Sequence, residues 1–273
     1  MIHLQSRPAS ATSLPIERDY ISYSSITSYQ ACPLRYYFKY VAGLPERTVS
    51  SSLVFGSAIH RAVEHHFNEL MVGSEPPTLD GLIGEYDRHW QETDESVVKF
   101  GKEEDKESLG PLAQRMLAAF QSSSMARVEG HIIGVEEQLR GPMIAGAPDL
   151  LGRIDLLVET RDELTVVDLK TARSRWSAEQ VAESGGQLLL YAELVRQLAP
   201  RKKLRLRFAV ITKAKEPSVD LHEVAADSKQ IDRIKRIVER VWKAIETGTF
   251  YPAPSPMQCP TCPFRQPCRA WAG

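Results

Sequence analysis

The chain contains 273 residues, of which 42% are hydrophobic and 25% are charged, with 16 glycines and 17 prolines. This composition is typical of a folded globular protein and argues against the collagen-like, disordered and disulfide-scaffold classes. At about 150 residues per domain, the length predicts one large or two small domains. The 34 basic residues balance the 35 acidic residues, and the resulting net charge of −1 indicates no particular partner.

The start of the chain carries no recognisable export or membrane signal. The opening segment MIHLQSRPASATSLP lacks an apolar core, and no run of about 18 apolar residues occurs elsewhere. We therefore expect a cytoplasmic protein that does not associate with membranes. Residues 1–20 are rich in Ser, Thr and Pro without periodicity, which predicts a flexible N-terminal arm.

The segment that follows the arm, about residues 21–128, is predicted to be mainly helical. From Ser24 onward, serine N-caps precede an aromatic-rich stretch, which predicts one or two short helices near Pro33. Apolar residues at a spacing of three to four in LVFGSAIHRAVEHHFNELM indicate an amphipathic helix. Two further helices are expected over 79–96 and 108–127.

After Gly130 the pattern changes to short segments rich in Val, Ile and Leu that are separated by turn residues, which predicts strands. These segments are HIIGVEEQL, IAGAPDLLGRIDLLVET and LTVVDLK. A helix over about 177–199, the strand KLRLRFAVIT, an edge strand VDLHEV and the helix SKQIDRIKRIVERVWKAIETG are expected to follow. The order predicts an α/β core over about 129–250, followed by a proline-rich tail over 251–273.

Two aspartates and a lysine stand inside apolar strand segments. Asp155 and Asp168 lie on two strands joined by a tight turn, and a carboxylate in such a strand is costly unless it is compensated. Lys170 follows Asp168 by two residues, so both side chains lie on one face of the strand. Carboxylates on rigid strands suit Mg²⁺ or Mn²⁺, and a lysine can assist an attacking water. We interpret the group as a site for phosphodiester hydrolysis; the alternative is a turn-proximal Asp155 and a surface ion pair.

The cysteines are unevenly distributed. Cys259, Cys262 and Cys268 form C-x2-C-x5-C in the last fifteen residues, whereas Cys32 lies near the opposite end. In a reducing compartment such a cluster indicates metal ligands rather than disulfides, and Cys32 is the one candidate for a fourth ligand. Four thiolates bind either zinc or an iron–sulfur cluster, and the spacing alone does not separate the two.

Four motifs occur in a fixed order along the chain: G-x-x-x-H from Gly56 to His60, G-x-x-D from Gly152 to Asp155, D-x-K from Asp168 to Lys170, and Q-x-x-x-Y from Gln187 to Tyr191. With these motifs the chain resembles the PD-(D/E)XK nucleases of the RecB type over about residues 24–268. Its cysteines are similar to those of the iron–sulfur branch, which includes AddB-type nuclease domains and the nuclease of CRISPR adaptation. The resemblance implies a single nuclease domain over 21–273 with a restriction-endonuclease-like α/β core. This core is a central mixed sheet flanked by helices, with an N-terminal helical insertion and a C-terminal cysteine-cluster tail.

The resemblance also implies roles for individual residues. It makes His60, Asp155 and Asp168 ligands of Mg²⁺ or Mn²⁺, with the backbone carbonyl of Leu169 as a further ligand, and it makes Lys170 the catalytic lysine. The imidazole shifts the metal preference toward Mn²⁺. A helical histidine is otherwise usually a surface or core residue, and that alternative stays open for His60.

Other positions around the predicted site are less specific. The resemblance implies that Gln187 and Tyr191, four residues apart on one helix face, contact the metal-bound water or the DNA backbone. The alternative is that Tyr191 is a core residue beside Leu188 and Leu190. Either Glu136 or its neighbour Glu137 is expected to support the site, and the sequence does not choose between them.

For the cysteines, the resemblance favours a 4Fe-4S cluster held by Cys32, Cys259, Cys262 and Cys268, with structural Zn²⁺ as the alternative. Such a cluster would join the two ends of the chain around the core and contribute to folding. We expect a structural rather than a redox role.

The balanced total charge hides two segments of opposite sign. Residues 196–215 contain eight basic and no acidic residues, whereas residues 81–110 contain nine acidic and four basic residues. The basic segment is either a phosphate-tracking surface or a solvated face. Aromatic residues near Cys32 could stack on unpaired bases or surround the cluster; they are Tyr36, Tyr37, Phe38 and Tyr40.

The sequence thus predicts a metal-dependent DNA nuclease, an exonuclease of single-stranded or frayed ends with weak sequence preference, in DNA repair or recombination. The alternatives are a CRISPR-adaptation nuclease and a non-catalytic DNA-binding partner of a helicase. No G-x-x-x-x-G-K-[ST] motif occurs, so any unwinding would require a partner.

Overall fold

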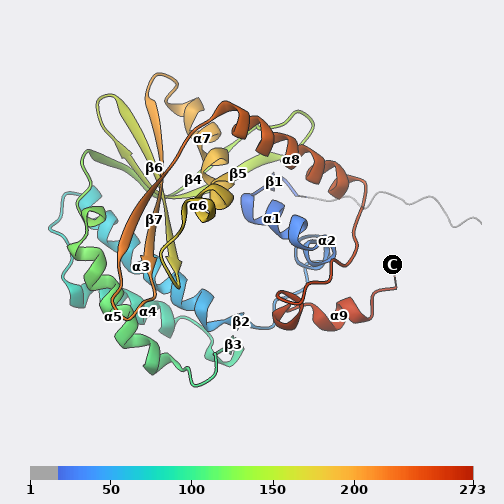
Figure 1. Cartoon of the computed structure of the whole chain (residues 1–273), viewed down its shortest axis with the longest axis horizontal. Helices are drawn as coiled ribbons and strands as arrows, with labels where there is room; N and C mark the ends of the chain where they lie inside the picture. The colour runs from blue at the N-terminus through green and yellow to red at the C-terminus, as the bar shows by residue number, and fades with distance from the viewer. Residues whose placement is uncertain (1–17, 273) are drawn as a thin grey trace, which may run out of the picture.

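The computed structural model describes residues 18–272, and in this part of the chain helices cover both faces of one central sheet (Figure 1). The six strands are β1 (Tyr20–Ile21), β4 (His131–Gly141), β5 (Asp149–Glu159), β6 (Glu163–Ala172), β7 (Lys203–Thr212) and β8 (Val219–Val224). Strands β6 and β7 run parallel and most other neighbours antiparallel. The predicted α/β fold with a central mixed sheet is therefore confirmed. Residues 1–17 of the expected N-terminal arm lie outside the described residues, and Tyr20 already belongs to the sheet.

Strand β5 divides one of its edges between two partners. Strand β4 pairs along the opposite edge, from Leu150 to Glu159 of β5. On the divided edge, β6 pairs with β5 as far as Leu156 and β1 pairs with its first two residues. Residues 151–155 of β5 have no strand partner on this edge among residues 18–272. The sheet thus forks between β5 and β6, and the fork opens beside Asp155.

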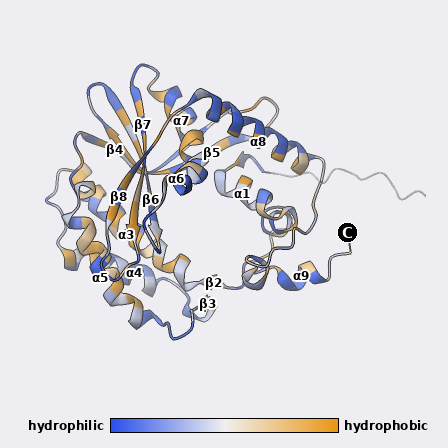
Figure 2. Cartoon of the chain, viewed as in Figure 1, coloured by the Kyte–Doolittle hydropathy of each residue, from blue (hydrophilic) through white to orange (hydrophobic). Residues whose placement is uncertain are grey.

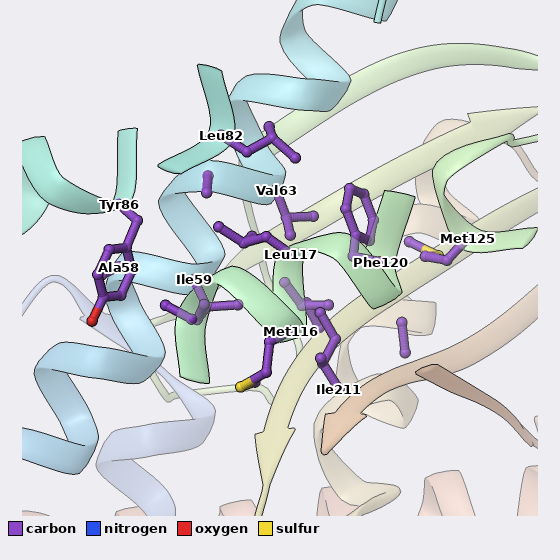
Figure 3. Packing of buried hydrophobic residues seen from close by; sticks show 14 of the residues in the cluster. Ala58, Ile59, Val63, Leu82, Tyr86, Met116, Leu117, Phe120, Met125 and Ile211 are labelled. Atoms are coloured by element: carbon purple, nitrogen blue, oxygen red, sulfur yellow. The ribbon is translucent and has the colours of Figure 1, made fainter. Parts of the chain in front are cut away.

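Three helices pack on one face of the sheet: α3 (Ser51–Met71), α4 (Leu79–Gln91) and α5 (Lys106–Ser122). Their buried side chains meet those of β7, as Ile59, Leu117 and Ile211 show in Figure 3. Burying a side chain of this size contributes roughly 1.5–3 kcal/mol. A short parallel pair, β2 (Val49–Ser50) and β3 (Val98–Lys99), joins the start of α3 to the segment between α4 and α5.

The boundaries of α4 and α5 differ from those predicted by periodicity. Helix α4 ends at Gln91 rather than near residue 96, because Asp94 accepts a hydrogen bond from the Ser96 backbone and begins a separate turn. Helix α5 begins at Lys106, because Asp105 caps it by accepting a hydrogen bond from the Ser108 backbone at 2.8 Å. Side chains that compete for backbone hydrogen bonds thus set both limits.

The other face of the sheet carries α1 (Tyr23–Ala31), α6 (Ala178–Ser184), α7 (Gly186–Leu198) and α8 (Ser228–Glu246). Hydrophobic residues concentrate on the strands and on the helix surfaces that meet them (Figure 2). The single helix expected over 177–199 is divided into α6 and α7 at Gly185 and Gly186, since glycine is a poor helix former. No helix within residues 18–272 has an apolar stretch long enough to cross a membrane.

The C-terminal tail returns to the N-terminal region of the chain (Figure 1). The Leu34 backbone in α2 (Pro33–Tyr36) donates a hydrogen bond to the Tyr251 carbonyl at 2.9 Å. Phe264, just before α9 (Arg265–Arg269), is buried against Leu34 and Phe38. A small apolar core, separate from the core around the sheet, therefore holds the tail against α2.

Candidate active site

Two aspartates occupy the fork between β5 and β6. The β5–β6 pairing ends at Leu156 and Val167, and the next residues along each strand toward the fork are Asp155 and Asp168. The Leu169 backbone N–H donates a hydrogen bond to Asp155 Oδ2 at 2.6 Å. Burial, together with the nearby charge of Asp168, raises the pKa of Asp155 well above its ordinary value. Two neighbouring carboxylates, one buried and one partly buried, favour a cation between or beside them.

The catalytic lysine predicted from the D-x-K motif lies at the same fork. Lys170 Nζ is 2.5 Å from Asp168 Oδ2, and Asp168 is only 2% exposed. The same ammonium donates a hydrogen bond to Gln187 Oε1 at 2.9 Å, and Gln187 Nε2 donates to the Tyr191 hydroxyl at 2.8 Å. Burial raises the pKa of Tyr191 to about 12, so its hydroxyl keeps its proton at neutral pH. The structure thus joins the D-x-K and Q-x-x-x-Y motifs in one hydrogen-bonded chain.

Three side chains from three elements form a compact group of metal-ligating atoms. His60 comes from α3, Glu136 from β4 and Asp155 from β5, and one ligand atom of each lies within 4.8 Å of the others. His60 Nδ1 is 3.8 Å from Asp155 Oδ2. Burial and the charge of Lys170 lower the pKa of His60 to about 4, so its imidazole is neutral at pH 7. Nitrogen and carboxylate donors in this arrangement suit Mn²⁺ or Mg²⁺.

The structure distinguishes the two adjacent glutamates that the sequence left open. Strand β4 shifts register between Ile132 and Gly134, after which Glu137 pairs with Ile154 in the ladder. Glu136 has a φ of 52°, a conformation that costs a non-glycine residue about 1–3 kcal/mol. With this backbone its carboxylate reaches the metal-ligating group, and strain of this kind is common at functional sites. No feature of the sequence could have indicated the shift.

Not all of the predicted metal ligands lie in the group of three ligating side chains. Leu169 lines the same cavity as His60 and Asp155, and its backbone is close enough to affect the pKa of His60. The carboxylate of Asp168 instead turns toward the lysine and lies outside the three-residue group, in which Glu136 stands. The structure therefore brings together two of the three predicted side-chain ligands, His60 and Asp155. It adds Glu136, which the sequence could not distinguish from Glu137.

The site opens into a cavity of about 740 Å³. One face of α3 forms its wall from Ser50 to Glu64, a rise of about 21 Å at 1.5 Å per residue. The helix lies close to the sheet because position 56 is glycine: a Cβ there would be 3.1 Å from Thr171 Oγ1. The glycine of G-x-x-x-H thus allows the approach that carries His60 to the fork.

All four cysteines line a second cavity of about 250 Å³, with Phe38 and Phe264 among its apolar walls. None of the cysteines forms a disulfide. The Ala253 backbone N–H donates to Cys32 Sγ at 3.5 Å, and the Ser255 backbone donates to Cys259 Sγ at 3.2 Å. Burial, together with the other three sulfurs, raises the pKa of the Cys268 thiol. The structure thus places Cys32 beside the C-terminal cysteines.

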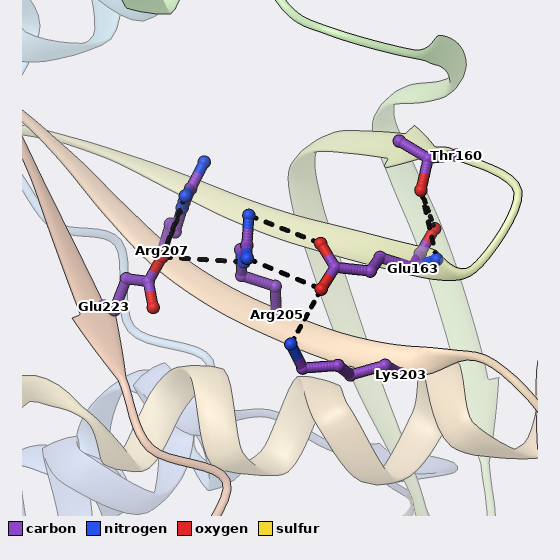
Figure 4. Close-up of polar contacts among 6 residues, drawn as sticks. All are labelled: Thr160, Glu163, Lys203, Arg205, Arg207 and Glu223. Carbon is purple, nitrogen blue, oxygen red and sulfur yellow. Dashed lines mark hydrogen bonds and ion pairs between the residues drawn. The ribbon is translucent and has the colours of Figure 1, made fainter.

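Four of the eight basic residues over 196–215 form ion pairs: Lys202, Lys203, Arg205 and Arg207. Lys203 and Arg205 contact Glu163 at 2.8 Å and 3.3 Å, and Arg207 contacts Glu223 at 2.8 Å (Figure 4). Lys203 and Arg205 lie near the start of β7, and Arg207 directly precedes Phe208, the register partner of Asp168. The structure therefore supports the solvated-face interpretation for these residues rather than a phosphate-tracking surface.

The aromatic residues after Cys32 are mostly core. Tyr36 is fully buried and Phe38 is 5% exposed. Tyr36 stacks on Phe250 with ring centroids 6.3 Å apart, and Phe38 packs against Trp271 at 5.8 Å. These rings support the cysteine tail and are not available to stack on bases.

The chain is similar to a known protein family and to solved structures. The family model of the PD-(D/E)XK nuclease superfamily matches residues 20–269. A crystal structure of a candidate exonuclease from Eubacterium rectale superposes with a TM-score of 0.61 at 17% identity, over 98% of this chain and 94% of that one. The structure of SSO0001 gives a TM-score of 0.36 at 15% identity, over 83% of this chain and 87% of that one. No curated protein matches the sequence. Because the family match spans nearly all of the described residues, the chain belongs to the PD-(D/E)XK nuclease superfamily.

Proposed function

We propose that this protein is a metal-dependent deoxyribonuclease, an exonuclease that hydrolyses phosphodiester bonds at single-stranded or frayed DNA ends in repair or recombination. The observation that carries the proposal is the group formed by His60, Glu136 and Asp155 within 4.8 Å, with Lys170 beside it. Two carboxylates and an imidazole held together in this partly buried site are costly without a cation that compensates them.

The donor set fits a divalent cation. His60, Glu136 and Asp155 would hold Mn²⁺ or Mg²⁺, with the carbonyl of Leu169 as a further ligand, and we retain Asp168 as an additional candidate ligand. When bound, such an ion polarises the scissile phosphate and lowers the pKa of a coordinated water. The imidazole among the donors favours Mn²⁺.

Lys170 has the geometry of a group that orients the attacking water and balances charge on the phosphate. Its ammonium is fixed by Asp168 at 2.5 Å and by Gln187 at 2.9 Å, and it still lines the cavity. The Tyr191 hydroxyl holds Gln187 in turn, so the ammonium cannot easily rotate away. In hydrolysis, the water oxygen forms a bond to phosphorus while the bond from phosphorus to the leaving 3′ or 5′ oxygen breaks. A positioned lysine contributes to this step by holding the water in line.

We further propose that the cysteines hold a 4Fe-4S cluster rather than zinc. Four sulfurs bound to one zinc lie about 3.8 Å apart, as follows from a Zn–S distance of about 2.3 Å in a tetrahedron. Among residues 18–272, the one group of three ligating atoms within 4.8 Å is the group around Asp155, so no three of the cysteine sulfurs lie within 4.8 Å of one another. Backbone N–H groups directed at Cys32 and Cys259 suit thiolates of a cluster.

A cluster at this place would join both ends of the domain proposed over residues 21–273. Anaerobically purified protein should contain about four iron atoms and four sulfides per chain, the ratio of the 4Fe-4S class. It should also show the visible charge-transfer absorption of such a cluster. One zinc and no iron per chain would refute this part of the proposal.

Hydrolysis is tested directly with labelled DNA. Single-stranded, blunt and frayed duplex DNA of equal length should be incubated with Mn²⁺, Mg²⁺ or a chelator, with the label at either end. The proposal predicts metal-dependent release of short products from unpaired ends. A Lys170→Ala variant serves as the control, and equal cleavage by this variant and the unmodified protein would contradict the proposed role of Lys170.

A further inference from the structure

Lys213 is a basic residue of the active-site cavity that the proposed mechanism does not use. It follows β7 directly, and its backbone N–H donates to the Ala172 carbonyl at the end of β6, at 2.6 Å. Its ammonium donates to Ser52 at the first turn of α3, to Oγ at 3.0 Å and to the carbonyl at 3.3 Å. It lies 4.8 Å from the ring centroid of Phe55, and it lines the same cavity as His60.

Every other lysine and arginine that lines this cavity has a carboxylate partner. Lys170 pairs with Asp168, Arg153 with Glu136, and Arg61 with Glu92 at 3.9 Å. Within residues 18–272, Lys213 forms no ion pair. The acid that acts on it, Glu104, is instead hydrogen-bonded to the Gly101 backbone.

This isolation distinguishes Lys213 from the basic residues of β7. Lys203, Arg205 and Arg207 are each compensated by glutamates on the sheet. A partly buried ammonium with no carboxylate in contact costs free energy, and burial lowers the pKa of Lys213, an effect that the charge of Glu104 offsets only in part. An anion that enters the cavity would supply the missing charge.

An exposed apolar residue of α3 directly follows the serine that Lys213 contacts. Leu53 follows Ser52, the hydrogen-bond partner of Lys213, and is 64% exposed. Its backbone N–H is already bound by Ser50 Oγ at 3.3 Å, so only the side chain is available for contact. Leu53 also lines the cavity. One end of the cavity therefore offers a cation next to an apolar surface, which matches the phosphate and base of one nucleotide.

We propose that Lys213 binds a backbone phosphate that flanks the scissile one, and that Leu53 packs against the base of the same nucleotide. The inference rests on the proposed nuclease function and adds a substrate subsite to it. In register, Lys170 is opposite Val210, so Lys213, which directly follows β7, lies three residues further along the chain, about 10 Å at 3.3 Å per residue. A stacked strand rises about 3.4 Å per nucleotide, so the phosphate bound by Lys213 would lie within about three nucleotides of the scissile phosphate.

The first experiment compares two substrates that differ in the flanking phosphate. A single-stranded oligonucleotide has it, whereas thymidine 5′-(p-nitrophenyl phosphate) has only the scissile phosphodiester. Lys213→Gln should lower kcat/KM for the oligonucleotide by about tenfold or more, the range of a lost charged hydrogen bond, and leave hydrolysis of the small ester unchanged. Lys213→Arg should restore most of the loss. The control Lys203→Gln removes a lysine at the start of β7 that is paired with Glu163, and it should affect neither substrate.

The second experiment measures binding and needs no turnover. In a Lys170→Ala background, the slope of log K against log salt for single-stranded DNA should fall by about 0.7 on adding Lys213→Gln, the value for one lost phosphate contact. Leu53→Ser should weaken binding of a normal strand and not of a strand of abasic residues. The control is Leu198→Ser, since Leu198 is similarly exposed at 67% and is not part of the cavity lining.

The two experiments separate failure of the subsite from failure of the nuclease proposal. An equal loss on both substrates, or an unchanged salt slope, would show that Lys213 only ties α3 to β7 through Ser52 and would overturn the inference. If the unmodified protein hydrolyses neither substrate with Mn²⁺, the proposed function fails, and the salt slope still decides whether Lys213 binds phosphate.

Discussion

The ring of Tyr191 lies directly against Gly152, so that a Cβ atom at position 152 would meet two ring carbons at 2.9 Å. The glycine that begins the G-x-x-D motif therefore leaves the space that the ring of the tyrosine ending the Q-x-x-x-Y motif occupies. Because Asp155 follows three residues later on the same strand, the contact fixes α7 relative to the carboxylate at the fork. Two motifs that are separate in the sequence form one steric unit in the fold.

Gly152→Ala is expected to destabilise the protein and to reduce activity, because the added methyl group must displace the Tyr191 ring or the backbone of β5. Overpacking of this kind costs about 1–3 kcal/mol, which urea unfolding measures. Gly110→Ala is the matched control: Gly110 lies in α5, a Cβ added there would meet no atom within 4 Å, and alanine should be neutral or stabilising. Equal effects of the two substitutions would contradict the steric explanation.

Glu136→Gln is expected to weaken binding of Mn²⁺ by roughly 10-fold or more, since it removes a charged oxygen from the group with His60 and Asp155. Glu137→Gln removes the same charge one residue away and should leave the affinity nearly unchanged. Calorimetric titration of each variant with Mn²⁺ measures both values. The same titration on Asp168→Asn decides whether Asp168 is also a ligand: an unchanged affinity would limit it to positioning Lys170.

Gln187→Ala is expected to lower kcat with little change in KM, because the Lys170 ammonium loses the 2.9 Å hydrogen bond that holds it toward the cavity. A loss of roughly 10-fold to 100-fold is typical for a residue that orients a catalytic group. Gln187→Glu keeps an acceptor for the lysine and should retain more activity than the alanine variant. A rise in KM at constant kcat would instead indicate that Gln187 contacts the substrate.

Stability should fall as the pH drops through about 6.5, the ordinary histidine value, because His66 is buried and its pKa is lowered in the folded protein. Below that pH the unfolded chain binds a proton that folded His66 does not accept, so protonation favours unfolding. His66 lies between Phe67 and Phe120, and His66→Phe should reduce the slope of stability against pH. The exposed His131→Gln is the control. Urea unfolding from pH 8 to pH 5 tests this, and an unchanged slope in His66→Phe would refute it.

Cys32→Ser is expected to remove the cluster and to lower the thermal midpoint, because the tail is held to α2 by a core of only three buried side chains, Leu34, Phe38 and Phe264. Iron content and thermal unfolding measured under anaerobic conditions report both effects. Retention of four irons per chain by the variant would show that Cys32 is not a ligand.

The sequence by itself determined the elements and the chemistry that depends on local spacing. Alternation and helical periodicity predicted the five strands from β4 to β8 and most helices, because burial on one face imposes a period that is visible in the residues themselves. The period of two also predicted that Asp168 and Lys170 share one face, and the structure finds them in contact at 2.5 Å.

Only the tertiary structure decided how these elements combine at the site. Glu136 rather than Glu137 reaches the fork because β4 shifts register, and a register shift depends on the partner strand. The basic residues of β7 are neutralised by Glu163 and Glu223, which come from the neighbouring strands β6 and β8. No glutamate or aspartate of a neighbouring element contacts Lys213 among residues 18–272, so its charge has no such partner. Spacing within a segment is fixed by local geometry, whereas register and ion pairing are set by contacts between residues far apart in the chain.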